Sequence, residues 1–228
     1  MPAARSRKRA NAALSERVTS LTDRAYADLE EMIVTLRIAP GTAVSEQELA
    51  QQLEIGRTPI REALQRLARE GLVSILPRRG IIVSGIDVTR QLRLLEVRRE
   101  LERLIARTAA RRATDEERAR FRDVAKRFEE SARVNDDVSF MRTDREFNTL
   151  CSAASHNEFA AGAMSLMHSL SRRFWYIHYK QAADMPLTAK LHANIARAIA
   201  KGDEEAATAA SDKLLDAIEK FTRNTTHM

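Results

Sequence analysis

The residues that first suggest chemistry lie in the stretch Gly56–Val73, GRTPIREALQRLAREGLV, where arginine recurs beside small hydrogen-bonding side chains. At about 100° of rotation per helical residue, Thr58, Arg61 and Gln65 fall within roughly 60° of one another, and Arg57 stands at the helix start. A guanidinium group donates two parallel hydrogen bonds, which match O6 and N7 of guanine in the major groove of DNA. The alternative is that these arginines only keep a helix surface soluble.

A second basic group lies between two short runs of β-forming residues, Val73–Leu76 and Ile81–Val83. The residues between them, Pro77–Gly80, read PRRG and form the expected tip of a β-hairpin. Arg78 and Arg79 at such a tip could reach the phosphate backbone or the minor groove of DNA.

Three helices must position these side chains: one that starts near Thr22, one that Ser45 opens, and the arginine-bearing helix. Ser45 and Glu48 have the spacing of a capping box, in which hydroxyl and carboxylate each satisfy a free backbone N–H. Pro59 falls in the first turn of the third helix, where its missing N–H costs little. The apolar residues of that helix share another side and form its expected core face: Ile60, Ala63, Leu64, Leu67 and Ala68. Three helices followed by a basic hairpin are the order of a winged helix-turn-helix, whose third helix enters the major groove.

The pattern changes after Gly85, because the rest of the chain shows only helical periodicity. The expected helices are roughly Val88–Arg112, Asp115–Ala132, Val138–Ser155, Glu158–Gln181, Pro186–Lys201 and Glu204–Thr222. We therefore predict a mainly α protein. Residues 1–20 would be a basic disordered arm, residues 21–84 a winged helix-turn-helix with a small β-hairpin, and residues 85–228 an all-α bundle of six or seven helices.

Composition narrows the class of protein. The chain has 228 residues, 44% of them hydrophobic, and a formal net charge of +6, which favours a polyanionic partner. No uncharged apolar run approaches the ~18 residues that a membrane span needs, so we expect no membrane partner. Cys151 is the single cysteine and cannot form an internal disulfide, so we expect a buried thiol in a cytoplasmic protein.

The segment APGTAVSEQELAQQLEIGRTPIREALQRLAREGLVSILPRRGIIV resembles the DNA-binding domain of the GntR family of bacterial transcription regulators. The resemblance implies that Arg57, Thr58 and Arg61 meet operator DNA and that Gly80 shapes the wing. Two positions depart from the family pattern. Gly56 stands where Ser or Thr is usual, and Gln47 stands where some members carry a basic residue.

The helical remainder resembles the effector domain of the FadR subfamily. Residues Leu94–Ala110 are similar to its opening helix, and Leu191–Ala210 are similar to its closing helix pair. Arg98 matches an arginine of that opening helix and is expected to point inward toward an anionic effector.

Many relatives of this kind hold a divalent metal with an Asp, a His four residues later, and two further His. By that resemblance the ligand positions are Asp144, Asn148, His192 and Leu214, and the ion would be Zn, Ni or Mn. Asp144 and residue 148 face the same way on a helix, but an asparagine is a weak ligand and Leu214 cannot bind a metal.

The segment MHSLSRRFWYIHYK is unusually rich in polar and aromatic residues, and one side carries His168, Arg172, Trp175 and Tyr179. One interpretation is an aromatic core stripe with arginines facing solvent. The other is the wall of a ligand pocket, where Arg172 or Arg173 meets a carboxylate. His168 or His178 would then be substitute metal ligands.

These patterns predict a ligand-responsive bacterial transcription regulator that binds DNA. It would repress a catabolic operon, and a small carboxylate effector would release the repressor from DNA. Two copies would bind a double-stranded, pseudo-palindromic operator as a homodimer. The effector residues would be Arg98, Asp144, Asn148, Arg172 and His192. One alternative is a sequence-indifferent DNA-binding protein. Another is a metal-dependent hydrolase built on Asp144, Asn148 and His192, but no nucleophile motif or general base accompanies them, so we expect no enzyme.

Overall fold

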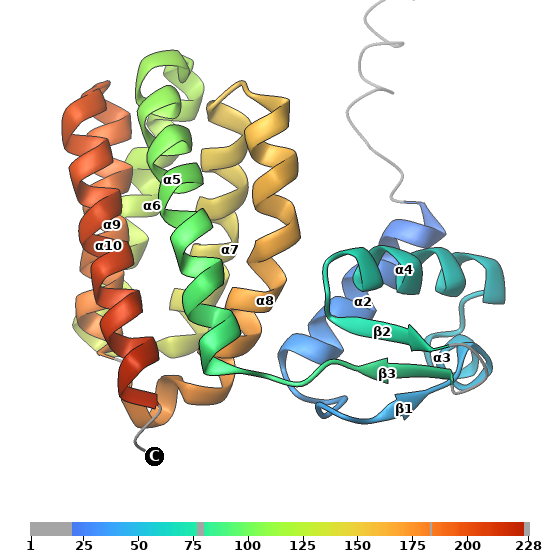
Figure 1. Ribbon diagram of the computed structural model, residues 1–228. Coiled ribbons are helices and arrows are strands. Elements are labelled where there is room, and N and C mark those ends of the chain that lie inside the picture. Colours follow the sequence, from blue (N-terminus) through green and yellow to red (C-terminus); the bar gives the residue numbers. More distant parts are fainter. Residues whose placement is uncertain (1–19, 77–79, 183, 226–228) are drawn as a thin grey trace, which may run out of the picture.

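The computed structural model describes residues 20–76, 80–182 and 184–225. The basic arm expected over residues 1–20 lies outside these ranges except for Ser20, and so do the hairpin-tip residues Arg78 and Arg79. The described chain forms a small N-terminal lobe and a larger helical bundle, joined by the segment that follows β3 (Figure 1). This arrangement confirms the predicted fold class.

The N-terminal lobe combines helices with a small antiparallel sheet. Its elements are α2 (Leu21–Val34), β1 (Ala43–Val44), α3 (Glu46–Leu53), α4 (Arg57–Arg69), β2 (Val73–Leu76) and β3 (Gly80–Val83). The strand order is β1-β3-β2, so β3 pairs with β2 in the expected hairpin and with β1 on its other side. The sequence did not predict β1, because two residues are too few to show an alternating pattern.

Short polar residues fix where several helices begin. The Ser45 hydroxyl accepts a hydrogen bond from the Glu48 backbone N–H at 3.1 Å, which is one half of the expected capping box. At the start of the bundle's second helix, Thr114 and Glu117 form both bonds of such a box, at 3.2 and 2.8 Å. Gly56 caps α4 without a side-chain hydrogen bond, so the first N–H groups of α4 stay available to a bound anion.

The N-terminal lobe has a hydrophobic core of its own, to which α4 contributes one face. Ile60, Ala63, Leu64 and Leu67 are at most 1% exposed, as the sequence predicts. They belong to one cluster with Leu29 and other residues of α2 and with the strands of the sheet. Because this face is buried, only the other sides of α4 can meet a partner.

The bundle consists, within the described ranges, of α5 (Val88–Arg112), α6 (Asp115–Val134), α7 (Asp137–Ala154), α8 (Glu158–Ala182), α9 (Met185–Lys201) and α10 (Glu204–Asn224). The ends of the expected helices agree with these bounds to within one or two residues. None of the helices in the described ranges combines the length and the apolar character that crossing a bilayer requires.

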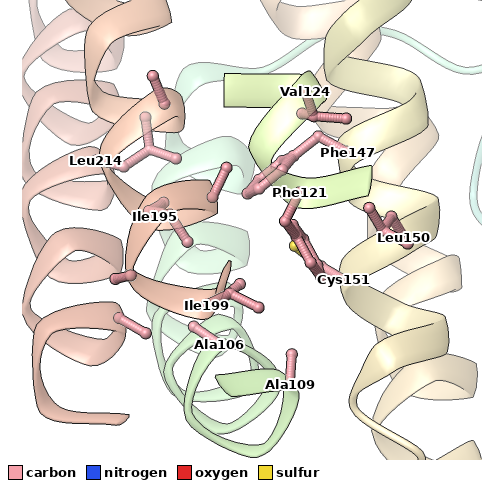
Figure 2. Close-up of a cluster of buried hydrophobic side chains, with 14 of the residues drawn as sticks. Ala106, Ala109, Phe121, Val124, Phe147, Leu150, Cys151, Ile195, Ile199 and Leu214 are labelled. Atoms are coloured by element: carbon pink, nitrogen blue, oxygen red, sulfur yellow. The ribbon is translucent and has the colours of Figure 1, made fainter. Parts of the chain in front are cut away.

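The centre of the bundle is packed with aromatic and small aliphatic side chains (Figure 2). The rings of Phe121 and Phe147 meet edge to face, with centroids 6.3 Å apart. Ala106 and Ala109 of α5 are fully or nearly buried, and their small size allows α9 to pack closely against α5. Cys151 lies in this core, and burial raises the pKa of its thiol well above the usual range, as expected for a cysteine without a catalytic role.

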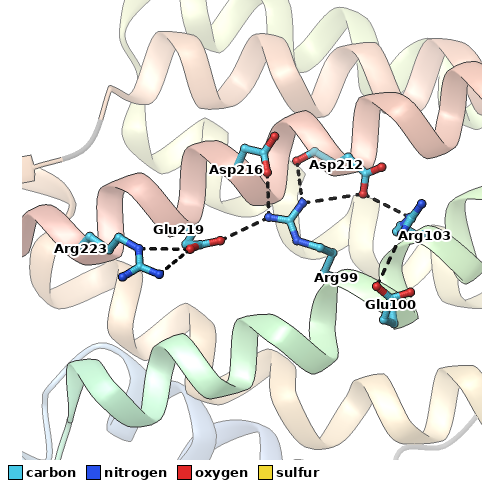
Figure 3. A network of polar contacts seen from close by, with 7 residues as sticks. All are labelled: Arg99, Glu100, Arg103, Asp212, Asp216, Glu219 and Arg223. Atoms are coloured by element: carbon cyan, nitrogen blue, oxygen red, sulfur yellow. Dashed lines mark hydrogen bonds and ion pairs between the residues drawn. The ribbon is translucent and has the colours of Figure 1, made fainter.

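An ion-pair network joins α5 to α10 along the bundle surface (Figure 3). The Arg99 guanidinium lies 2.8 Å from Asp216 and 3.5 Å from Glu219, and Arg103 lies 3.3 Å from Asp212. A single exposed pair contributes little to stability, but a network of this kind fixes how two helices align. The first and the last helix of the bundle are therefore held to each other.

Candidate DNA-binding face and effector pocket

The predicted DNA-contacting residues of α4 share one exposed face. Arg57, Thr58, Arg61 and Gln65 are all exposed, and the side chains of Arg57 and Arg61 are 63% and 53% exposed. The buried residues of the same helix point away from them into the core. The free N-terminal turn and the two guanidinium groups therefore lie where a DNA duplex can reach them.

Glu46, which the sequence analysis did not single out, holds the two arginines of this face. Both oxygens of the Glu46 carboxylate accept hydrogen bonds from Arg61 Nε and Nη2 at 2.8 Å, and Arg57 lies 3.8 Å away. Hydrogen bonding by Arg61 lowers the pKa of the Glu46 carboxyl, with the nearby charges of Arg61 and Arg57 adding to the effect. The pairing is exposed, so guanine or phosphate can compete for Arg61. Its place in the first turn of α3, next to the cap Ser45, marks Glu46 as a helix-start residue but does not indicate its pairing with Arg61.

Replacing Glu46 with glutamine is expected to tighten binding to random-sequence DNA by a few-fold at low salt. The change removes a negative charge from the face that is predicted to approach DNA phosphates, and salt screens such effects. Fluorescence anisotropy of a labelled random duplex over a salt series measures it. The control is Glu116→Gln, which removes the same charge from an exposed position on α6. Equal tightening by both variants would show that only net charge matters.

The wing is present, and its glycine has a conformational reason. Gly80 opens β3 with φ +83°, in the left-handed region that favours glycine, and it is exposed. A Cβ atom added there would meet nothing within 4 Å, so the backbone conformation and not the space around it selects glycine. The position shapes the hairpin, as the family resemblance implies.

The bundle encloses a cavity of about 70 Å³ that brings together all the predicted effector residues. The lining includes Arg98, Asp144, Asn148, Arg172 and His192, drawn from α5, α7, α8 and α9. His168 and Trp175 also line it, so the polar-aromatic side of α8 forms a pocket wall. Sequence reasoning missed Glu102, whose carboxylate accepts hydrogen bonds from Arg98 one turn earlier on α5.

The two adjacent arginines of α8 have different positions. Arg172 lines the cavity, whereas the Arg173 guanidinium donates hydrogen bonds to the carbonyl oxygens of Ser84 and Gly85 at 2.9 and 3.1 Å. Burial and the charge of Arg90 lower the pKa of Arg173 to about 10. Tyr179 donates its hydroxyl to Asp137 at 2.7 Å and is not part of the cavity lining.

His192 and Asp144 form a buried pair in the cavity. His192 Nδ1 donates to the Thr188 carbonyl at 2.8 Å, and Nε2 lies 3.0 Å from Asp144 Oδ1. Burial alone would raise the pKa of Asp144, but the hydrogen bond from His192 and the positive charges nearby lower it. The rings of Phe128, Phe140 and Phe147 surround His192 at 5.0 to 5.7 Å and fix its orientation.

The metal ligands that the family resemblance implies are only half present. Asn148 and Leu214 line the same cavity as Asp144 and His192, so the four positions do converge. Across the described residues, no cluster of three or more His, Cys, Asp or Glu side chains could hold a metal ion. Zn, Ni and Mn take four to six ligands. Two strong ligands that already bond each other do not fit a tightly held divalent ion.

Models of known protein families match both lobes of the chain. The model for "Bacterial regulatory proteins, gntR family" matches residues 21–83, and the model for "FCD domain" matches residues 93–217. The Nta operon transcriptional regulator of Aminobacter aminovorans is 31% identical over 206 residues, covering 85% of this chain and 96% of that protein. The HTH-type transcriptional repressor RspR of Escherichia coli K12 is 26% identical, covering 87% of each chain.

Among solved structures, E. coli McbR/YncC has a similar fold, with a TM-score of 0.78 at 18% sequence identity, covering 91% of this chain and 99% of that one. A putative GntR transcriptional regulator from Rhodococcus has a TM-score of 0.63 at 20% identity, covering 90% of this chain and 99% of that chain. Family models match both lobes, and one regulator is 31% identical to the chain. The exposed arginine-bearing face of α4 is the feature that a DNA-binding regulator needs. The chain belongs to the GntR family of bacterial transcription regulators and carries that family's DNA-binding domain followed by an FCD domain.

Proposed function

We propose that this regulator is a FadR-subfamily repressor of a catabolic operon, which a small carboxylate effector releases from DNA. The observation that carries the proposal is the pairing of two sites in one chain. The exposed arginines Arg57 and Arg61 offer a DNA-binding face, and a bundle cavity contains Arg98 and Arg172. The similarity to an operon regulator and to a repressor supports control of an operon.

The chemistry of the cavity favours a small organic acid. Arginine binds a carboxylate through two parallel hydrogen bonds, and two arginines line this cavity. Phe140 and Trp175 supply apolar walls beside these arginines, the combination of apolar lining and a few polar groups that is typical of ligand pockets. The side chains Ser171 Oγ and Trp175 Nε1 are buried without a hydrogen-bond partner in the described part of the chain, so each can serve a second polar group of the effector.

The same cavity supports direct recognition of the acid, without a resident metal. Asp144 and His192 satisfy each other, and Asn148 offers an amide that can donate to a carboxylate. We further propose that two copies bind a pseudo-palindromic operator as a homodimer in the cytoplasm, since dimer symmetry mirrors half-site symmetry. The similarity to regulators supports this function over the metal-dependent hydrolase alternative.

The effector proposal predicts that at least one small carboxylate raises the melting temperature of the protein, with EDTA making no difference. Sodium acetate, malonate, benzoate and citrate at matched ionic strength form the test panel. A ligand at 100 times its Kd adds about 2.7 kcal/mol to the free energy of unfolding, which a thermal-shift assay detects.

The effector test has a matched pair of variants on α5. Arg98→Met removes a cavity-lining arginine and should abolish the shift, whereas Arg103→Met removes an arginine paired with Asp212 on the surface and should preserve it. The absence of any shift, or the same shift in both variants, would contradict the proposed pocket.

A sequence-indifferent DNA-binding protein would instead be indicated by equal affinity for random and selected duplexes, because a specific regulator prefers its site by ~10³ or more.

A further inference from the structure

Helix α8 contacts both lobes of the protein. It packs against α5 and α7 in the bundle and against α2 of the N-terminal lobe, as Figure 1 shows from its position beside that lobe. Leu170 of α8 packs on the core of the N-terminal lobe, and Arg173 holds the carbonyl oxygens of Ser84 and Gly85 in the connection. A movement of α8 would therefore change its contacts with the DNA-binding lobe.

Arg172 of α8 is bound to two acids of α2. Its Nη1 donates to Glu30 Oε1 at 2.7 Å, and its Nη2 donates to Glu31 Oε2 at 3.3 Å. Glu30 is only 3% exposed, and the Arg172 side chain is 16% exposed. The contact spans 142 positions of the sequence and joins the bundle to the DNA-binding lobe.

The same guanidinium belongs to the cavity. Arg172 is one of the lining residues, together with Asp144 of α7. Burial would lower the pKa of Arg172, but Glu30, Glu31 and Asp144 together raise it. The charge of Arg172 is thus shared between carboxylates of α2, outside the bundle, and a carboxylate of the pocket.

The ion pair between Arg172 and Glu30 has no favourable intermediate state between intact and fully broken. A buried carboxylate that loses its cation is strongly disfavoured, so Glu30 must stay paired or become exposed to water. Glu30 Oε2 is buried with no hydrogen bond from the described residues, and the exposed Arg145 lies 3.8 Å from it. A competing anion at Arg172 would leave Glu30 with this more distant cation as its remaining ion-pair partner within the described ranges.

We propose that Arg172 couples the pocket to the DNA-binding lobe, because the effector carboxylate and Glu30 of α2 compete for its guanidinium. This inference rests on the proposed function, since it assumes an anionic effector in the cavity. Effector binding displaces Glu30 and Glu31, and α2 separates from α8. The position of α4 relative to the bundle then changes, and with it the spacing of the DNA-binding faces in a dimer.

Thermodynamic linkage predicts the direction in which the affinity for the effector changes when the Glu30 contact is weakened. If the effector and Glu30 compete, weakening the Glu30 contact must strengthen effector binding by the same factor. Glu30→Gln keeps the shape and a hydrogen-bond acceptor but removes the charge, so it should tighten carboxylate binding roughly tenfold. Glu31→Gln removes the weaker and more exposed partner, so it should act in the same direction with a smaller effect.

The experiment titrates sodium acetate, malonate, benzoate and citrate into the full-length protein and its variants at matched ionic strength. Hydrogen–deuterium exchange of the α2 backbone is followed in the same samples. The control is Glu146→Gln, which breaks the 2.8 Å ion pair between Arg127 of α6 and Glu146 of α7, a half-exposed pair on the bundle surface away from α2. Circular dichroism verifies that each variant is folded. If Glu30→Gln does not fold, the carboxylate affinity of Glu31→Gln is the test of the competition.

Three results separate this inference from the proposed function. Tighter carboxylate binding by Glu30→Gln or Glu31→Gln, with faster α2 exchange than in Glu146→Gln, supports the competition. A carboxylate that binds the wild type and both variants equally overturns it and leaves the effector pocket intact. If no carboxylate binds any of the proteins, the organic-acid effector fails, and the competition fails with it.

Discussion

Replacing Arg61 with alanine is expected to lower the preference of the protein for its operator over random DNA roughly 10- to 100-fold. The guanidinium is exposed at the first turns of α4, and Glu46 already holds it in a two-point hydrogen bond. A group presented in this way can exchange the carboxylate for O6 and N7 of guanine. An operator selected from a random library, titrated against a random duplex by anisotropy at several salt concentrations, gives the ratio of affinities.

The control for this loss lies on the same helix. Arg69 is exposed at the opposite end of α4, so Arg69→Ala removes the same charge without touching the first turn and should leave the preference unchanged. An equal loss of affinity for every sequence in Arg61→Ala would identify Arg61 as a phosphate contact and would remove the proposed base reading.

The double substitution Asn148→His with Leu214→His is expected to create a Zn²⁺ site that binds on the order of a hundredfold tighter than the wild type, or better. Both positions line the cavity that already contains Asp144 and His192, so four ligands would converge. Leu214 is 1% exposed, and a histidine there is costly until a metal satisfies it. The melting temperature of the double variant should therefore fall in EDTA and recover in Zn²⁺, while isothermal titration gives the affinity.

Two further variants show whether the site is the intended one. Asn148→His alone provides three ligands and should bind Zn²⁺ with intermediate affinity. Adding His192→Ala to the double variant should remove most of the gain, because His192 Nε2 faces Asp144 at 3.0 Å. If the wild type already binds Zn²⁺ as tightly as the double variant, then groups other than Asp144 and His192 complete the metal site, and the absence of two ligands does not weaken it.

The sequence predicted the helices well because local chemistry determines their ends. The Ser45 hydroxyl caps the start of α3, as its spacing from Glu48 implies, and the expected ends of the bundle helices differ from the observed ends by at most two residues. The buried face of α4 also followed from periodicity alone: four of the five apolar residues predicted on one side are buried, and Ala68 is partly buried against the same core. Each of these inferences involves residues within a few positions of one another.

The contacts that the sequence did not predict are those between distant residues. Nothing in the α3 segment indicates that Glu46 binds Arg61, because that pairing depends on the angle between two helices. Likewise, Arg172 and Arg173 are equivalent candidates by composition. A rotation of about 100° between neighbours places one in the cavity and the other on the connection. DNA contact by Arg78 and Arg79 stays a prediction.

The separate cores of the two lobes have a consequence for engineering and for evolution. Because the DNA-binding lobe has a hydrophobic core of its own, it can be exchanged between regulators, provided that its contacts with α8 of the bundle are kept. In such a hybrid, the acidic pair Glu30 and Glu31 must travel with the sensor's Arg172 rather than with the operator preference of α4. A chimera that lacks the pair is expected to recognise its DNA and to bind the carboxylate, but the bound carboxylate would no longer change the position of the DNA-binding lobe.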